Sequence, residues 1–353
     1  MRPGPSDLRG SVGVGARVSV MRGRDVLAVD VPVVDVVVDA TRDRVVPIQV
    51  TYTAPRDWVP TDPLSPLNNF GQRSRVVAVL DVNGTPAEVE LGWFQHTAWE
   101  ESDDGVQVTC LDLMQTLVEN PLTWPSSPPS GATVLSELRR LCSMDSGTGL
   151  PVILESGNAS VPRTTQFGTD RAENIKDLCD SYGLDYAVKP DGYLHAWAKR
   201  DGRDPVAHYS AVDLGTPGTA GVLLSAPRKS QDRRPNRWTV VGGGDSKRSA
   251  TVSTTQAPYE PTAYGIVNAR YELSQAGSQA QVTKAAESYQ RDATITSETR
   301  SLEIPADPRL EIGDVISAET DTGEMLVGRV AAYSLPVDDA SARMRVDVER
   351  LLW

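Results

Sequence analysis

The sequence has 353 residues, with 35 lysines and arginines against 47 aspartates and glutamates, so its formal net charge is −12. Hydrophobic residues make up 39% and charged residues 23%, which is near the globular average and excludes a mainly disordered chain. The net negative charge excludes a protein that binds nucleic acid by neutralising phosphates. It is compatible with a channel through which DNA passes without binding. Chains of this length usually form two or three domains.

Neither a membrane span nor a signal peptide is predicted. The sequence has no apolar segment long enough to cross a membrane, and Met1–Pro5 lacks the apolar core of a signal peptide. The three cysteines, Cys110, Cys142 and Cys179, are an odd set with no Cys-x-x-Cys spacing. We expect buried free thiols in a protein that folds in a reducing compartment.

The first third is predicted to be an arm followed by a β domain. Residues 1–15 are rich in proline and glycine, as in an extended arm. Residues 16–120 are interpreted as the first β-barrel domain, with strands predicted at 18–20, 26–31, 33–38, 45–52, 75–82, 89–93, 94–99 and 106–111. Asn83-Gly84 is typical of a two-residue hairpin turn, in which both residues need positive φ. The Pro-rich segment 54–72 is a candidate docking loop.

Residues 121–225 are predicted to form a small α/β domain. Apolar spacing predicts helices at 133–143 and 170–182, the second capped by Asp170 and stopped by Gly183. Strands are expected at 184–188 and 193–198. The side chains expected on the buried faces of the helices are Val134, Leu135, Leu138, Leu141, Cys142, Ala172, Ile175, Leu178, Cys179 and Tyr182.

Residues 226–353 are predicted to form a second β-barrel domain, with a small helical insertion around 256–297. The helix is expected at 278–293, with Val282, Ala285, Ala286 and Tyr289 inward. Strands are expected at 237–241, 295–304, 315–320, 325–334 and 344–351.

The ends of the two β regions share an order of features, which indicates a weak internal repeat. In the first region a strand, the turn Asn83-Gly84, a second strand, the acidic spacer Glu100–Asp104 and a third strand follow one another. In the last region the turn is Thr322-Gly323 and the spacer is Val337–Asp339. Chance similarity between hairpins is the alternative. With a true repeat, one chain carries two similar barrels and a ring of three chains carries six.

No motif favours catalysis or metal binding. The three histidines, His96, His195 and His208, lie far apart and lack metal-ligand spacing. The run Gly242–Gly244 lacks the lysine of a phosphate loop, and Glu100–Asp104 lacks the ligand order of a calcium loop. We expect a protein that is not an enzyme, with no cofactor and no bound metal.

Short segments in a fixed order carry a family resemblance. They are Pro63–Val79, Leu91–Phe94, Val106–Asp112, Asn174–Trp197, Asp307–Ile316 and Leu326–Val330. In this order they cover most of the chain and resemble the minor tail proteins, or tail-tip (baseplate) hub proteins, of long-tailed bacteriophages that infect actinobacteria.

The resemblance implies a mainly β fold with α+β parts, in which two tube-like β-barrel domains flank a small α/β domain. It implies a structural virion protein that forms a homotrimeric hub at the tail tip, adapts the six-fold tail tube to a three-fold tip, closes the channel and permits DNA passage. The implied partners are the distal tail protein, the tape-measure protein and other minor tail or receptor-binding proteins. Transiting DNA would not be bound specifically, and the location would be the virion tail tip, after assembly in the host cytoplasm.

Two groups of residues are candidates for these contacts. The candidates for subunit interfaces are Trp58, Pro60, Leu64, Phe70, Trp124 and Trp353. The candidates for an acidic lumen or ring edge, which would repel phosphates, are Glu100, Glu101, Asp103, Asp104, Asp338 and Asp339. The basic cluster Arg228-Lys229 and Arg233-Arg234 could pair with acidic patches of neighbours.

Two other functions stay open. One is a β-rich glycan-binding or glycan-cleaving tail protein, because acidic residues are plentiful enough to supply a catalytic pair. The other is a receptor-binding tip protein. A ring-shaped trimer would favour the hub, and a compact monomer would favour the enzyme.

Overall fold

A computed structural model of the chain describes residues 1–5, 8, 12–42, 44–144, 149–199, 204–211, 221–223, 225–230, 233–242, 248–273, 276, 278–320 and 322–351. Strands account for 47% of the protein and helices for 15%. The protein is therefore mainly β with a smaller helical part, as the sequence predicts.

The chain forms two compact units, each assembled from separated stretches of sequence. The first, here called the sheet unit, contains Met1–Gln115, Gly202–Gln231 and Ser297–Leu351. The second, here called the α/β unit, contains Thr116–Asp201, Asp232–Thr296 and Leu352–Trp353. The two predicted β domains thus share one unit, and this division differs from the boundaries expected at 225 and 226.

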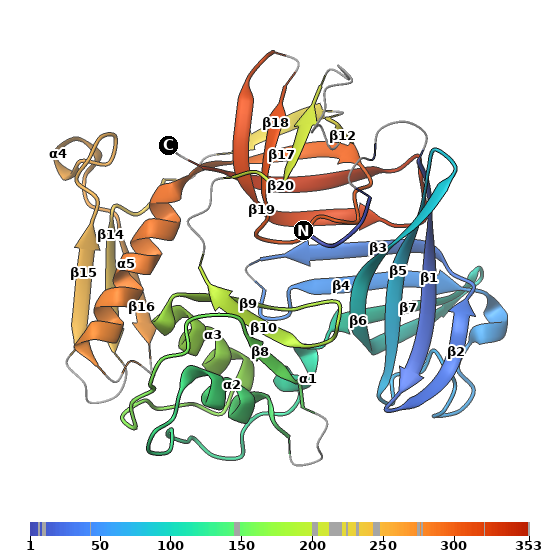
Figure 1. Cartoon of the computed structure of the whole chain (residues 1–353), viewed down its shortest axis with the longest axis horizontal. Coiled ribbons are helices and arrows are strands. Elements are labelled where there is room, and N and C mark those ends of the chain that lie inside the picture. Colours follow the sequence, from blue (N-terminus) through green and yellow to red (C-terminus); the bar gives the residue numbers. More distant parts are fainter. Residues whose placement is uncertain are drawn as a thin grey trace. The chain divides into compact units, whose positions relative to one another are not determined.

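The sheet unit is built on one 14-stranded sheet (Figure 1). Its first half contains β1 (Val12–Arg22), β2 (Asp25–Val31), β3 (Val34–Thr41), β4 (Ile48–Ala54), β5 (Gln72–Val82), β6 (Thr85–Ser102) and β7 (Gly105–Asp112). Its second half contains β11 (Ala207–Ser210), β12 (Gly221–Val222), β13 (Ser225–Ser230), β17 (Thr296–Pro305), β18 (Val315–Glu319), β19 (Met325–Pro336) and β20 (Arg343–Leu351). A single-turn 3-10 helix, Arg56–Trp58, follows β4.

The two halves have the same strand order across the sheet. The first runs β2-β1-β5-β6-β7-β4-β3, and the second runs β12-β11-β18-β19-β20-β17-β13. When the seven strands of each half are numbered in chain order, both halves read 2-1-5-6-7-4-3 across the sheet. One difference is direction, because β1 is antiparallel to β5 whereas β11 is parallel to β18. The shared order extends the weak sequence repeat from three strands to seven.

The edge strand of the first half, β3, pairs with a central strand of the second half, β19. β3 pairs antiparallel with the last part of β19, from Thr41↔Ala332 to Val37↔Pro336, and Figure 1 shows these two strands side by side. The prediction of two tube-like barrels needs correction, because none of the strand pairings among the described residues closes either half into a barrel. The edge of the first half is instead occupied by the second half.

Arg2, within the predicted extended arm, is held against the sheet unit by hydrogen bonds. Val12 already belongs to β1, and the Arg2 side chain is 5% exposed. Its guanidinium donates to the carbonyls of Pro308 and Leu310 at 3.0 and 2.6 Å. These hydrogen bonds hold the first residues against the loop that precedes β18, because a buried guanidinium needs acceptors.

The α/β unit contains two small sheets with their helices. β8 (Val152–Leu154), β9 (Leu184–Val188) and β10 (Leu194–Ala198) form the sheet order β8-β10-β9, with α2 (Val134–Cys142) and α3 (Arg171–Tyr182) beside it. β14 (Arg237–Gly242), β15 (Ser249–Ser253) and β16 (Asn268–Leu273) form the order β15-β14-β16, against which α5 (Gln279–Ile295) packs. Two single-turn helices, α1 (Gln115–Val118) and α4 (Pro261–Tyr264), complete the described elements.

Several local predictions are confirmed. Asn83 and Gly84 have φ of 53° and 82° and join β5 to β6. The Asp170 side chain accepts from the Glu173 backbone N–H at 2.9 Å, and Gly183 ends α3 with φ 64°. The three cysteines are buried and free.

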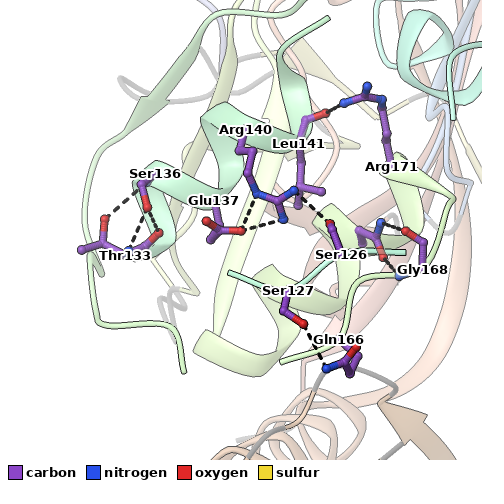
Figure 2. A network of polar contacts seen from close by, with 11 residues as sticks. Ser126, Ser127, Thr133, Ser136, Glu137, Arg140, Leu141, Gln166, Gly168 and Arg171 are labelled. Carbon is purple, nitrogen blue, oxygen red and sulfur yellow. Dashed lines mark hydrogen bonds and ion pairs between the residues drawn. The ribbon is translucent and has the colours of Figure 1, made fainter. Parts of the chain in front are cut away.

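The buried face of α2 differs from the prediction at two positions. Leu135 is half-buried, whereas Glu137 is 1% exposed. Figure 2 shows the cause: Arg140 forms an ion pair with Glu137 at 2.8 Å and donates to the Ser126 hydroxyl at 3.0 Å. Because its charge is paired, Glu137 can occupy an interior position that a pattern of apolar residues does not predict.

Candidate functional site

The candidate docking loop, Ala54–Gln72, is attached to the sheet unit at its centre. Leu67 is fully buried, and Asn68 is 7% exposed. The Asn68 side-chain oxygen accepts from the Trp99 indole at 3.3 Å, and its amide nitrogen donates to the Asp62 carbonyl at 2.8 Å. Gln72 adds donors to the carbonyls of Pro63 and Ser65 at 2.9 and 3.0 Å.

A buried polar cluster lies beneath this loop. The Nδ1 of His96 is 3.0 Å from the Asn68 carbonyl, which can only accept, so Nδ1 carries the hydrogen. The Nε2 is therefore the acceptor, 2.7 Å from the Ser74 hydroxyl. The Tyr52 hydroxyl lies 2.9 Å from Ser74. Burial lowers the pKa of His96 to about 4, against hydrogen bonds that favour its charged form.

The loop exposes two of the four interface candidates within it. Leu64 and Phe70 are 58% and 57% exposed. Trp58 and Pro60 are half-buried, and Trp58 packs against the core of the sheet unit. Leu64 and Phe70 are thus the most exposed of these four side chains, and the hydrogen bonds of the loop hold their backbone in place.

Among the described residues of the α/β unit, Trp124 is the most exposed large apolar residue, at 77%. The chain on both sides of it is fixed: the Leu122 N–H donates to the Thr169 carbonyl at 2.7 Å, and Ser126 and Phe167 exchange backbone hydrogen bonds at 3.0 and 2.8 Å. A large aromatic side chain held in water by an ordered backbone is typical of an interface anchor. Trp353 lies outside the described residues.

The acidic candidates lie at two hairpin ends of the sheet unit. Glu100 and Glu101 are exposed residues of β6, and Asp103 and Asp104 form the turn to β7. The Arg56 guanidinium lies 3.3 Å from Glu101. Each of these carboxylates is in contact with solvent, so none has a role in the core.

Asp338 and Asp339 have local structural roles. The Asp338 carboxylate accepts from the Val36 N–H at 2.9 Å and so binds β3 at the junction of the halves. Asp339 accepts from the Ser341 N–H and hydroxyl at 2.8 and 2.6 Å, and these bonds lower its pKa. Sequence reasoning placed both residues in a lumen or at a ring edge and missed these backbone acceptor roles.

A second buried polar cluster was not predicted. Arg309 and Asp307 form an ion pair at 2.7 Å, with side chains 4% and 2% exposed, and the Tyr209 hydroxyl donates to Asp307 at 2.7 Å. Arg309 also donates to the Pro5 carbonyl. Asp307 and Arg309 belong to the segment Asp307–Ile316, which the sequence analysis had marked for its family resemblance.

The described residues offer little for chemistry. No group of three or more His, Cys, Asp or Glu among them is arranged to hold a metal ion. His195 lies between Glu155 and Asp191 at 3.1 and 2.9 Å, on the surface of the α/β unit. None of the helices in the described ranges has the length and apolar character of a membrane span.

Comparison with known proteins agrees with this architecture. A family model described as a putative phage tail protein matches residues 171–333. No curated protein matches the sequence. The tail protein from Neisseria meningitidis MC58 is 14% identical, with a TM-score of 0.62 over 95% of this chain and 97% of that chain.

Two prophage proteins have similar structures. The 43 kDa tail protein of prophage MuSo2 from Shewanella oneidensis is 12% identical, with a TM-score of 0.60 over 95% of this chain and 98% of that chain. The prophage tail protein gp18 from Listeria monocytogenes EGD-e is 10% identical, with a TM-score of 0.57 over 94% of both chains. Over nearly its whole length, this chain has the fold of phage tail proteins.

Proposed function

We propose that this chain is a structural protein of a phage tail and forms the trimeric hub at the tail tip. The observation that carries the proposal is the common strand order of the two halves of the sheet unit. Three copies in a ring contain six such halves, which matches a six-fold tube on one side and a three-fold tip on the other. A head-to-tail arrangement that closes on itself gives such a ring.

The polar face of the sheet supports a path for DNA through this ring. Side chains of β4 alternate between the core and the opposite face. On the opposite face polar residues of β4 have polar neighbours in β3, β7 and β19, together with the apolar Val37 opposite Thr51 and Leu111 opposite Gln49. The polar positions are Asp39, Gln49, Thr51, Thr53, Gln107, Thr109 and Ser334. Arg345, opposite Ser334, lies 3.3 Å from the carboxylate of Asp347. The same row of residues also contains Arg73, opposite Gln95. A largely polar face on which Arg345 is ion-paired, in a chain of net charge −12, would hold phosphates weakly.

The exposed anchors support contacts with other tail proteins. Leu64 and Phe70 lie on the fastened loop of the sheet unit, and Trp124 lies on the α/β unit. The hub would use such surfaces for the distal tail protein, the tape-measure protein and receptor-binding proteins. The location is then the tail tip of the virion of a long-tailed phage, with an actinobacterial host.

Labelling of intact particles tests the proposal. Gold-labelled antibodies against this chain should bind the end of the tail that is distal to the capsid, in negative-stain images. Label along the tail tube or on the capsid would contradict a tip hub, and particles that lack the chain would contradict a virion protein.

A charge placed on the polar face tests the path for DNA. Thr51→Arg puts an unpaired cation on this face, and DNA should then leave the particle more slowly while tails assemble normally, because phosphates would bind it. Thr51→Gln is the neutral control. Equal ejection rates for both variants would contradict a role of this face in DNA passage.

A further inference from the structure

We propose that the junction between the two halves of one chain is repeated between neighbouring copies, with Arg228–Ser230 of β13 in one copy pairing antiparallel with Glu100–Ser102 of β6 in the next. This inference rests on the proposed ring and specifies how its subunits are joined. It follows from residue-level equivalences between the halves.

The first equivalence is between β6 and β19. Pairing of β6 with β5 ends at Gln95, and pairing of β19 with β18 ends at Arg329. Two residues further along, both strands have an irregularity against the next strand: β6 skips residue 97 and β19 skips residue 331. Both features give the same alignment, in which Ala98–Ser102 corresponds to Ala332–Pro336.

The second equivalence is between β3 and β13. β3 pairs with β4 at Val34↔Thr53, then has a register shift, and continues at Val37↔Thr51. β13 pairs with β17 at Ser225↔Glu303, then has the same shift, and continues at Arg228↔Ser301. Val37–Asp39 therefore corresponds to Arg228–Ser230.

The junction within the chain gives the register of the junction between copies. Within the chain, Val37, Val38 and Asp39 of β3 lie opposite Pro336, Leu335 and Ser334 of β19. The equivalences transfer this register to three new pairs of residues: Arg228↔Ser102, Lys229↔Glu101 and Ser230↔Glu100.

Both strands have a free edge in the described part of the chain. There, β13 pairs only with β17, and the edge of β6 beyond Gln95 on the β5 side has no strand beside it. Glu100, Glu101 and Ser102 are exposed, whereas Tyr333 and Leu335 in the corresponding part of β19 are buried. The exposed stretch of β6 is thus the position that β3 covers in the other half.

The residue types favour a second copy as the partner. Val38 and Leu335 lie opposite each other in the internal junction and are 0% and 1% exposed. At the corresponding positions of the junction between copies lie Lys229 and Glu101. Their side chains have opposite charges and can be exposed to water before assembly. Opposite charges placed directly across two antiparallel strands attract each other. The proposed junction thus places the basic residues Arg228-Lys229 of one copy beside the acidic run Glu100–Asp104 of the next.

One contact of the internal junction has no counterpart. Asp338 accepts from the Val36 N–H, and the residue that corresponds to Val36 is Pro227, which has no N–H. A proline is accepted in an edge strand because one side of the strand needs no donor. The junction between copies therefore depends more on the charged pair than the internal one does.

Cysteine cross-linking tests the register on the full chain. Lys229→Cys combined with Glu101→Cys should form disulfides between copies under mild oxidation, and non-reducing gels should show linked dimers and trimers. Lys229→Cys with Glu88→Cys is the matched control, because Glu88 is an exposed residue of the same strand that lies opposite Val79 of β5. The native cysteines are buried and should not contribute.

A charge exchange tests the interaction without new bonds. Glu101→Lys should weaken association about tenfold, because two cations would then face each other, and the double variant Glu101→Lys with Lys229→Glu should recover it. Trimers without cross-links at 229/101 and without recovery would overturn the strand pairing but leave the proposed hub intact. A wild-type chain that stays monomeric at every concentration would overturn both.

Discussion

His96 links the candidate docking loop to the interior of the sheet unit as a neutral side chain. Its Nδ1 holds the Asn68 carbonyl, and its Nε2 accepts from Ser74. Protonation would turn this acceptor into a donor in a buried site, where a charge without a counter-ion is unfavourable. The residue therefore makes the loop sensitive to acid.

The variant His96→Gln should have a weaker dependence of stability on pH. The pKa of His96 is about 4 in the folded chain and 6.5 in the unfolded chain, so the unfolded chain binds more protons between these values. The contribution of His96 to the free energy of unfolding should therefore fall by about 2 kcal/mol between pH 7 and pH 5. The variant lacks this loss. Urea unfolding at pH 7 and pH 5 measures it.

The comparison between the two proteins isolates His96. Burial raises the pKa of Asp112 to about 7, which changes stability in the opposite direction, but equally in both proteins. Identical pH dependences for the wild type and His96→Gln would show that folding does not lower the pKa of His96.

Substitutions of Trp124 and Trp238 can distinguish a residue needed for assembly from one needed for folding. Trp124 is 77% exposed and Trp238 is 1% exposed. Trp124→Ala should change the free energy of unfolding by less than about 0.5 kcal/mol but reduce incorporation of the chain into tails. Trp238→Ala should destabilise the α/β unit by about 3–5 kcal/mol. A large stability loss in Trp124→Ala, measured by thermal unfolding, would contradict the assignment of an interface anchor.

At the scale of elements, local signals were predicted and long-range pairings were not. Asn83-Gly84 and the cap at Asp170 act within a few residues, so their sequence is sufficient to identify them. The pairing of β3 with β19 joins segments almost 300 residues apart in the chain. Its direct partners include Val38 and Leu335, which resemble any other apolar strand residues. Short strands such as β12 carry no periodic pattern at all.

The docking loop is also an element whose centre belongs to the core. The sequence predicts a docking loop at residues 54–72, but Leu67 at its centre is fully buried. Removal of the whole segment would therefore disturb folding as well as assembly. Point changes at the exposed positions separate the two effects.

Leu64→Ser with Phe70→Ser should leave folding intact and impair assembly. Both side chains are more than half exposed, so the free energy of unfolding should change by less than about 1 kcal/mol. Tails that contain the variant should be fewer, because the apolar contacts of the loop are lost. Leu67→Ser is the control and should destabilise the sheet unit. Normal tail numbers with the double variant would contradict a docking role for this loop.

At the scale of the whole molecule, the common strand order has the largest consequence. A repeat that was faint in the sequence is present in seven strands of each half, because strand order is preserved where residue identities are not. The α/β unit is formed by two main insertions. Thr116–Asp201 lies between the two halves in the sequence, and Asp232–Thr296 lies within the second half, between β13 and β17. For this reason the sequence suggested two separate β domains rather than one sheet.

The mass of the assembled chain tests the central claim most directly. Native mass spectrometry of the purified protein should give a species of three chains, and images of that species should show a ring with a central opening. A monomer, or an open-ended series of larger oligomers without a closed ring, would contradict the trimeric hub.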